Sequence, residues 1–450
     1  MRVPRNAPEL DGPIVTRFLR LLLQAQAGMP KKAEDDEESV SDVVSEPAPE
    51  EENEEESNDL TKADIVTKYR CAGDIANSVL QQLLAAVKPG ATCVELCSLG
   101  DRLVDEAVSK IYNKKAEGGK KIEKGSAFPT CISVNHCVGH YSPLLSEDKV
   151  VLEEGDVVKI DLGVHVDGYI ATLAHTVLCG SPAAAGRKAD VIQAAYQAAE
   201  LAQRMYKEGC ANSEITEMIS KVAADFKCNP VEGVLSHQMK KHVIDANKVI
   251  INKPSTEQQV AKAEIEKNDV FAMDIVMSTG EGKPRPSELR TTVFKRNISE
   301  KYSLKMKASR SFFSEVSHIL AEGVVLPLLS FCRAFLYLQV NQRFPTMPFT
   351  LRAGDERNWR MGVVECVKHS LFTEYPVLFD KEGTFVAQFK FTVMLLPSGN
   401  AVRITGGPPP DATSEFALQD PALQELLAVS TEKKKKNKPK KKKAGDKEDN

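Results

Sequence analysis

The chain has 450 residues, of which 42% are hydrophobic and 27% are charged, as in an ordinary soluble protein. Its ten cysteines include no CxxC pair. This spacing argues against a zinc ribbon or a disulfide framework and favours reduced thiols in the cytosol or nucleus. The length allows either two or three domains or one large unit with an extra segment at each end.

The net charge of −4 hides an acidic segment near the N-terminus. Fourteen acidic residues and no basic one lie between Glu34 and Asp59. Such a composition buries too little apolar surface to fold, so we predict disorder over residues 1–60. A second methionine, Met29, resembles a cytosolic start, and residues 1–28 are assigned no function.

Regular structure is predicted to begin near Thr61, where apolar residues recur at helical spacing until "KPG" at Lys88. A second helix is predicted from about Val94 to Ile111. Strands and helices then alternate, which indicates an α/β or α+β domain over residues 61–428. The predicted strands include "VVKIDLGVHVDGYIATLAHTV", "DVFAMDIVMS" and "GTFVAQFKFTVMLLP", and "GRKADVIQAAYQAAELAQRMY" is a predicted helix.

The apolar segment from Ser317 to Asn341 does not fit this alternation. It is about as long as a membrane span, but Glu322, Pro327 and Arg333 argue against insertion into a bilayer. We interpret it as an atypical insertion that arises from alternative splicing or from a gene-model error. If translated, it would expose a large apolar patch and favour aggregation.

Asp167 and Gly168 form a strong signal for a type I′ hairpin between two apolar runs. In such a two-residue turn Gly163 faces Thr172, and Asp161 lies one diagonal step away on the same face. Acidic residues at both positions would form a metal clamp, but only Asp161 is acidic.

Three further polar residues lie in apolar surroundings, namely His237, Asp274 and Lys390. Taken alone, each has an ordinary explanation: a core or surface histidine, an aspartate bonded to nearby backbone, and a lysine on an edge strand that reaches water. A lysine in a buried strand would instead require a partner of opposite charge.

Several long motifs resemble those of the type-2 methionine aminopeptidases, which are metallopeptidases with the pita-bread fold. The resemblance rests on "AFPTCISVNHCVGHYSP", "VVKIDLGVHVDGYIATLAHTV" and "FVAQFKFTV", and it covers about residues 61–428. Further matches, among them "KADIVTKYR", "LKMKASRSFFSEV" and "RMGVVEC", point to a non-catalytic branch of this family. The resemblance implies an α+β pita-bread fold with a pseudo-two-fold β-sheet core flanked by helices.

The resemblance also implies where a metal site would lie. The active enzymes bind two divalent metals through Asp, Asp, His, Glu and Glu. A histidine that contacts peptide substrate in the enzymes matches His140, and a second histidine of theirs falls on Asp245. The five ligand positions correspond, in the order given, to Asp161, Thr172, His237, Asp274 and Lys390.

These replacements predict a site without metal, cofactor or catalysis. Asp161 and Asp274 supply −2 where four carboxylates would balance two divalent ions, and Lys390 adds +1. An ammonium about 4 Å from one positive charge costs about 4 kcal/mol at an effective dielectric constant near 20. We therefore expect both carboxylates to hold Lys390. The alternatives are a residual single-metal aminopeptidase at His237 and Asp274, and an adaptor that binds peptide termini through His140.

The resemblance implies binding to structured RNA and to the large ribosomal subunit near the nascent-chain exit. It further implies roles in translation, rRNA processing, growth and transcriptional corepression, with receptor and corepressor partners, in cytoplasm, nucleus and nucleolus. We expect a monomer that does not bind membranes.

A lysine-rich tail, predicted to be disordered over residues 429–450, is typical of sequence-independent phosphate binding or of a nuclear or nucleolar signal. Because no aromatic RNP-type motif appears, recognition of RNA shape is favoured over base readout. The candidate binding residues are Lys433, Lys434, Lys435, Lys436, Lys438, Lys440, Lys441, Lys442 and Lys443, with Lys114, Lys115, Lys120 and Lys121 as secondary candidates.

The segment "LQELL" fits the LxxLL motif that enters nuclear-receptor-type grooves, through Leu423, Leu426 and Leu427. A leucine stripe of this kind more often belongs to an amphipathic helix that packs on its own domain. The sequence leaves both interpretations open.

Overall fold

The computed structural model describes residues 58–114, 121–147, 150–180, 183–255, 258–300, 302–319 and 347–430. All of them belong to one compact unit, Glu51–Asn450. The acidic segment up to residue 57, most of the atypical insertion and the lysine-rich tail lie outside the described residues. Within the described ranges no helix is long and apolar enough to cross a membrane.

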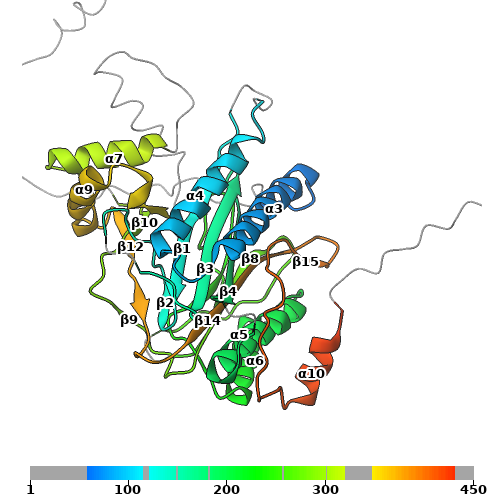
Figure 1. Cartoon of the computed structure of the whole chain (residues 1–450). Helices are drawn as coiled ribbons and strands as arrows, with labels where there is room; N and C mark the ends of the chain where they lie inside the picture. The colour runs from blue at the N-terminus through cyan, green and yellow to red at the C-terminus, as the bar shows by residue number, and fades with distance from the viewer. Residues whose placement is uncertain are drawn as a thin grey trace, which may run out of the picture. The chain divides into compact units, whose positions relative to one another are not determined.

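A nine-stranded antiparallel sheet forms the core of the fold (Figure 1). Its main path runs β1-β3-β4-β14-β8-β6-β7, with β15 paired to β14 and β5 paired to β8. The strands are β1 (Lys124–Val134), β3 (Val157–Val166), β4 (Tyr169–Leu178), β14 (Val386–Leu395), β8 (Val270–Ser278), β6 (Leu235–Gln238), β7 (Val249–Ile251), β15 (Ala401–Arg403) and β5 (Asn229–Pro230).

The predicted hairpin joins β3 to β4 with the expected register. Gly163 faces Thr172, and both turn residues have positive φ, 55° at Asp167 and 78° at Gly168, as a type I′ turn requires. A Cβ atom on Gly168 would lie 2.5 Å from the ring of His242, so glycine is also required sterically. The Asp-Gly pair thus sets which residues share a face with Asp161.

Strand β14 lies inside the sheet, between β4 and β8, and all ten of its residues are buried. The edge-strand explanation for Lys390 is therefore wrong, because hydrogen-bonded neighbours occupy both sides of β14. Its apolar residues fit this position, since strands that are buried on both faces read as nearly continuous hydrophobic runs.

The long helices cover the face of the sheet opposite to Lys390. Helices α3 (Ala63–Ala86) and α4 (Cys93–Ser109) pack with Ile160 and Leu162 of β3. Helices α5 (Gly186–Met205) and α6 (Asn212–Asp225) pack with Phe389 and Phe391 of β14. Because side chains alternate along a strand, Asp161 and Lys390 point to the other face. The first two helices confirm the sequence-based prediction, and Thr92 and Glu95 form a capping box at α4.

A smaller aromatic layer adjoins the main sheet. Strands β10 (Val293–Arg296), β11 (Phe349–Thr350) and β12 (Phe372–Tyr375) form a second sheet against α7 (Lys307–Ile319) and α9 (Glu356–Lys368). Phe312 and Trp359 pack edge to face at 5.4 Å between the two helices. A third sheet contains β2 (Cys137–Gly139), β9 (Arg285–Pro286) and β13 (Leu378–Phe379).

Candidate functional site

The ammonium group of Lys390 bridges two buried carboxylates. Its Nζ lies 2.8 Å from Asp161 Oδ2 and 3.0 Å from Asp274 Oδ2. Strand register explains this meeting, because Lys390 pairs with Asp274 on β8 and with Ala174 on β4, and Ala174 faces Asp161 on β3. Each of the three charged residues is no more than 8% exposed. The site is a three-residue ion cluster inside the sheet, as the sequence predicted.

Burial and charge act in opposite directions on the pKa of Lys390. Burial lowers it, but attraction to Asp161 and Asp274 is stronger in sum and raises it above the usual value. The ammonium therefore stays charged at neutral pH. Burial also raises the pKa of Asp161, and the nearby charge of Asp274 adds to this effect, whereas Lys390 opposes it. Two carboxylates share one ammonium, so the cluster has a net charge of −1 when all three groups are ionised.

Some of the polar atoms around the cluster have hydrogen-bond partners and others do not. Gln388, two positions before Lys390 on the same face, donates from Nε2 to both oxygens of Asp274, at 2.9 and 3.1 Å. Asp161 Oδ1, Thr172 Oγ1 and His237 Nδ1 are buried without a hydrogen-bond partner among the described residues. Buried polar atoms seldom lack a partner. These three atoms belong to residues that the family resemblance aligns with metal ligands.

The histidines near the cluster are neutral. Burial, together with the nearby charge of Lys390, lowers the pKa of His237 to about 4. His140 donates from Nδ1 to the carbonyl of Pro376 at 3.1 Å, and burial lowers its pKa to about 4 as well. The ring of His140 lies edge-on to Tyr375 at 5.3 Å. Asp245, the remaining position from the resemblance, forms an exposed ion pair with Lys295 instead.

The residues present do not fit a divalent metal. Within the described ranges no group of three or more His, Cys, Asp or Glu side chains is arranged to hold one. Lys390 Nζ contacts both carboxylates that a metal would need, and Gln388 engages both oxygens of Asp274. Thr172 supplies only a neutral hydroxyl, so a cation entering here would meet a charged ammonium rather than a ligand.

Phe128 and Tyr375 lie beside the ion cluster, and neither is distinguished in the sequence. Lys390 Nζ lies 5.4 Å from the centroid of the Phe128 ring, which is a cation–π distance. Phe128 and Tyr375 pack edge to face at 5.8 Å. Gln388 was missed too, although its place on the same face of the strand as Lys390 was the available signal.

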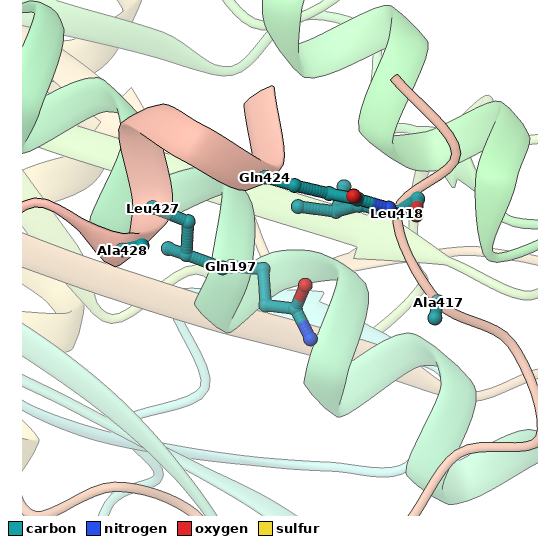
Figure 2. A pocket seen from close by; sticks show the side chains of 6 residues that line it. All are labelled: Gln197, Ala417, Leu418, Gln424, Leu427 and Ala428. Atoms are coloured by element: carbon teal, nitrogen blue, oxygen red, sulfur yellow. Dashed lines mark hydrogen bonds between the residues drawn. The ribbon is translucent and has the colours of Figure 1, made fainter. Parts of the chain in front are cut away.

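The LxxLL leucines contact their own domain. They lie on α10 (Pro421–Ala428), where Leu423 is buried and Leu426 and Leu427 pack against the core formed by α5, β8 and β14. A receptor groove could receive this helix only after it leaves α5. Figure 2 shows the shallow hollow that remains between α5 and α10, lined by Gln197, Ala417, Leu418, Gln424, Leu427 and Ala428.

The proposed RNA-binding lysines are mostly outside the described part of the chain. Lys114 and Lys121 are exposed on either side of residues 115–120, which the structure does not describe. The other candidates lie in the ranges 115–120 and 431–450, which the structure does not describe.

Comparison with known proteins identifies the family. The model of metallopeptidase family M24 matches residues 67–290. ErbB-3 binding protein 1 of Arabidopsis thaliana is 46% identical over 385 residues, which cover 85% of this chain and 91% of that protein. Curved DNA-binding protein of Schizosaccharomyces pombe is 35% identical, with 82% of this chain and 91% of that protein covered.

A solved structure of a thermophilic Arx1 aligns with a TM-score of 0.72 at 27% identity, over 83% of this chain and 100% of the other. The chain therefore belongs to metallopeptidase family M24 and has its pita-bread fold. Within that family, its similarity to ErbB-3 binding protein 1 extends over most of both proteins. The resemblance identified from the sequence motifs is confirmed.

Proposed function

We propose that this chain is a non-catalytic member of family M24 that binds structured RNA and ribosomes. The observation that carries the first half of the proposal is the position of Lys390 between Asp161 and Asp274. Two-metal hydrolysis needs cations that activate water and stabilise the developing charge. An ammonium held by the same carboxylates removes both the ligands and the space for those cations.

The aminopeptidase assay tests this half directly. Purified full-length chain, given a short Met-peptide and excess Co²⁺ or Mn²⁺, should release no methionine. The informative variant combines Thr172→Asp with Lys390→Glu, which replaces the cation by two carboxylates beside Asp161 and His237. It should retain divalent metal through gel filtration, whereas Thr172→Asp alone should not, because Lys390 still repels the ion. Turnover by the unmodified chain that His237→Ala abolishes would contradict the proposal.

Binding to RNA is supported by charge and by one relative. The tail carries nine lysines between Lys433 and Lys443, and a relative that is 35% identical is called a curved DNA-binding protein. Clustered lysines bind phosphate backbones without reading sequence, at the cost of strong salt dependence. We place the target on the large ribosomal subunit near the nascent-chain exit. The associated roles are in translation, ribosome biogenesis and growth, in cytoplasm, nucleus and nucleolus, with receptor and corepressor proteins as further partners.

The RNA proposal has its own test. The full chain and a version ending at residue 430 should be compared for binding to an RNA hairpin and for co-sedimentation with large ribosomal subunits. Removal of the tail should weaken hairpin binding by about tenfold or more and should flatten its salt dependence. Equal binding by both versions at all salt concentrations would contradict a role of the tail. This outcome is independent of the peptidase assay.

A peptide-binding adaptor is the second candidate. Asp161 Oδ1 has no hydrogen-bond partner among the described residues, and the ammonium of Lys390 beside it lies over Phe128, whose ring neighbours are His140 and Tyr375. A carboxylate beside aromatic rings suits a peptide amino terminus. Saturable binding of Met-peptides without cleavage, lost in His140→Ala, would favour the adaptor, and absence of binding would exclude it.

A further inference from the structure

Three arginines line a surface pocket in the smaller aromatic layer of the fold. The pocket has a volume of about 310 Å³ and is lined by Arg290, Arg357, Arg360 and Met361. The last three belong to the first two turns of α9, and Arg290 precedes β10. This pocket shares no residue with the Lys390 site.

Hydrogen bonds hold the walls of the pocket together. The carboxylate of Glu356, at the start of α9, accepts from the backbone N–H of Leu145 at 2.6 Å and of Ser146 at 3.2 Å. Arg290 Nε lies 3.0 Å from Glu147 Oε1 in the same loop. The loop after β2, the loop before β10 and α9 are therefore fastened to one another, and the pocket is preformed.

The charges in this pocket do not balance. Arg290 is paired with Glu147, and Glu356 accepts from two backbone amides, which are neutral and leave its charge of −1 in place. The side chains of Arg357 and Arg360 form no ion pair or hydrogen bond within the described ranges, and the three guanidinium groups exceed the carboxylates of Glu147 and Glu356 by one positive charge. A phosphate monoester carries a charge of about −1.5 to −2 at neutral pH. Arginine also binds phosphate through two parallel hydrogen bonds, so a phosphate group matches these arginines in charge and in geometry.

Exposed aliphatic side chains accompany the arginines. Leu145 is 60% exposed, Leu289 47%, Met361 56% and Val364 60%. Leu289 adjoins Arg290 in sequence, the backbone of Leu145 is bonded to Glu356, and Val364 follows Met361 by one turn of α9. A nucleic-acid backbone offers nothing apolar for such side chains, and single strands bind through aromatic stacking. Arginine and methionine together with aliphatic residues are typical of protein interfaces.

We propose that this surface docks a phosphorylated segment of a partner protein. The phosphate group of a phosphoserine or phosphothreonine occupies the pocket between Arg357 and Arg360, with Arg290 at its edge. An aliphatic side chain next to the phosphorylated residue packs on Met361 and Val364. This is the Arg-cluster mode of phosphopeptide recognition, and it uses residues other than the lysine-rich tail.

The test measures binding of a fluorescent peptide to the full chain by anisotropy. The probes are a short peptide with phosphoserine between two leucines, its unphosphorylated twin, and an RNA hairpin. The phosphopeptide should bind at least about tenfold more tightly than its twin. Arg357→Glu combined with Arg360→Glu should remove that difference, and Met361→Asp should weaken phosphopeptide binding while leaving both arginines in place.

Arg70→Glu with Lys88→Glu is the matched control, because it makes the same charge change at two exposed positions of the α3 region. It should leave the preference for the phosphopeptide unchanged. Equal binding of the phosphopeptide and its twin would overturn the proposal. It would also be overturned if the arginine reversal weakened RNA hairpin binding and left the phosphopeptide unaffected, since the pocket would then be a nucleic-acid contact.

Discussion

The Lys390 site and the three-arginine pocket both contain cationic side chains, but the chain treats these charges in opposite ways. Lys390 lies inside the sheet and finds two carboxylates and an aromatic ring within the protein. Arg357 and Arg360 lie at the surface with no acidic partner in the described residues. A buried charge must be paired because desolvation is expensive, whereas an exposed one keeps its hydration and stays available. Lys390 therefore stands where the related enzymes have a metal-coordinating side chain, whereas the exposed arginines can bind an anion.

The largest effect should come from removing the buried cation. Lys390→Ala leaves Asp161 and Asp274 facing each other without a counter-charge and should lower the free energy of unfolding by about 3–5 kcal/mol at pH 7. Urea denaturation measures this, and the exposed Lys62→Ala is the control, with an expected change below about 0.5 kcal/mol. A loss below about 1 kcal/mol for Lys390→Ala would contradict the claim that the buried cation, unlike the exposed arginines, stabilises the fold.

Lys390→Met separates the effect of charge from the effect of lost packing, because methionine fills similar space without a charge. Once the ammonium is gone, the folded-state pKa values of the two carboxylates should lie above their unfolded values near 4. The folded state then binds more protons than the unfolded state, so stability falls as pH rises and recovers as pH falls toward 4. Denaturation of Lys390→Met at pH 7 and pH 5 should show that recovery, and an equal deficit at both pH values would contradict it.

A smaller effect should come from each buried histidine when the unmodified chain is acidified. Burial lowers the pKa of His165 to about 3, and it lowers the pKa values of four other histidines to about 4, namely His140, His175, His237 and His242. The unfolded histidines take up protons near pH 6.5, so stability is lost as pH falls below that value, by up to about 1.4 kcal/mol per histidine per pH unit. Each of these rings should cost about 1.6 kcal/mol between pH 6.5 and 5, and the raised pKa of Asp161 opposes part of the total loss.

The measurement is the urea midpoint at the two pH values, with His175→Asn as the comparison. That variant should be less sensitive to acid, since one of the buried neutral rings is gone. A midpoint that rises on acidification would mean that the carboxylates of the Lys390 site dominate the titration.

The smallest effect on stability should come from the exposed arginines. Arg357→Glu combined with Arg360→Glu should change the free energy of unfolding by less than about 0.5 kcal/mol, because neither side chain has a partner to lose among the described residues. The same denaturation assay measures it. A loss as large as that of Lys390→Ala would mean that the arginines stabilise the fold, and the contrast would fail.

Local sequence rules predicted the parts of the site that depend on residues close together in the sequence. Asp167 and Gly168 defined the hairpin and its register, which placed Asp161 and Thr172 on one face. Periodicity predicted α3 and α4 with nearly correct ends. The order of polar residues along the chain, read through the family resemblance, identified Lys390 as the residue that meets the carboxylates.

Those rules could not predict which strands and helices meet when they lie far apart in the sequence. The apolar stretch around Lys390 is equally consistent with an edge strand and a central strand, and only the pairing of β14 with β4 and β8 decided between them. The three-arginine pocket draws Arg290 and Arg357 from distant parts of the sequence, with no spacing that links them. The LxxLL leucines were ambiguous for the same reason, since exposure of that helix depends on whether α5 lies beneath it.

By itself, the sequence determined the family, the hairpin register and the identity of the residues that occupy the former ligand positions, because these depend on neighbours a few residues apart or on long ordered motifs. Only the tertiary structure decided that Lys390 is enclosed by Asp161 and Asp274 and that the side chains of Arg357 and Arg360 have no acidic partner in the described part of the chain. The physical reason is that the energy of a charge depends on its burial and its partners, and both are set by strands and loops that lie far apart in the chain.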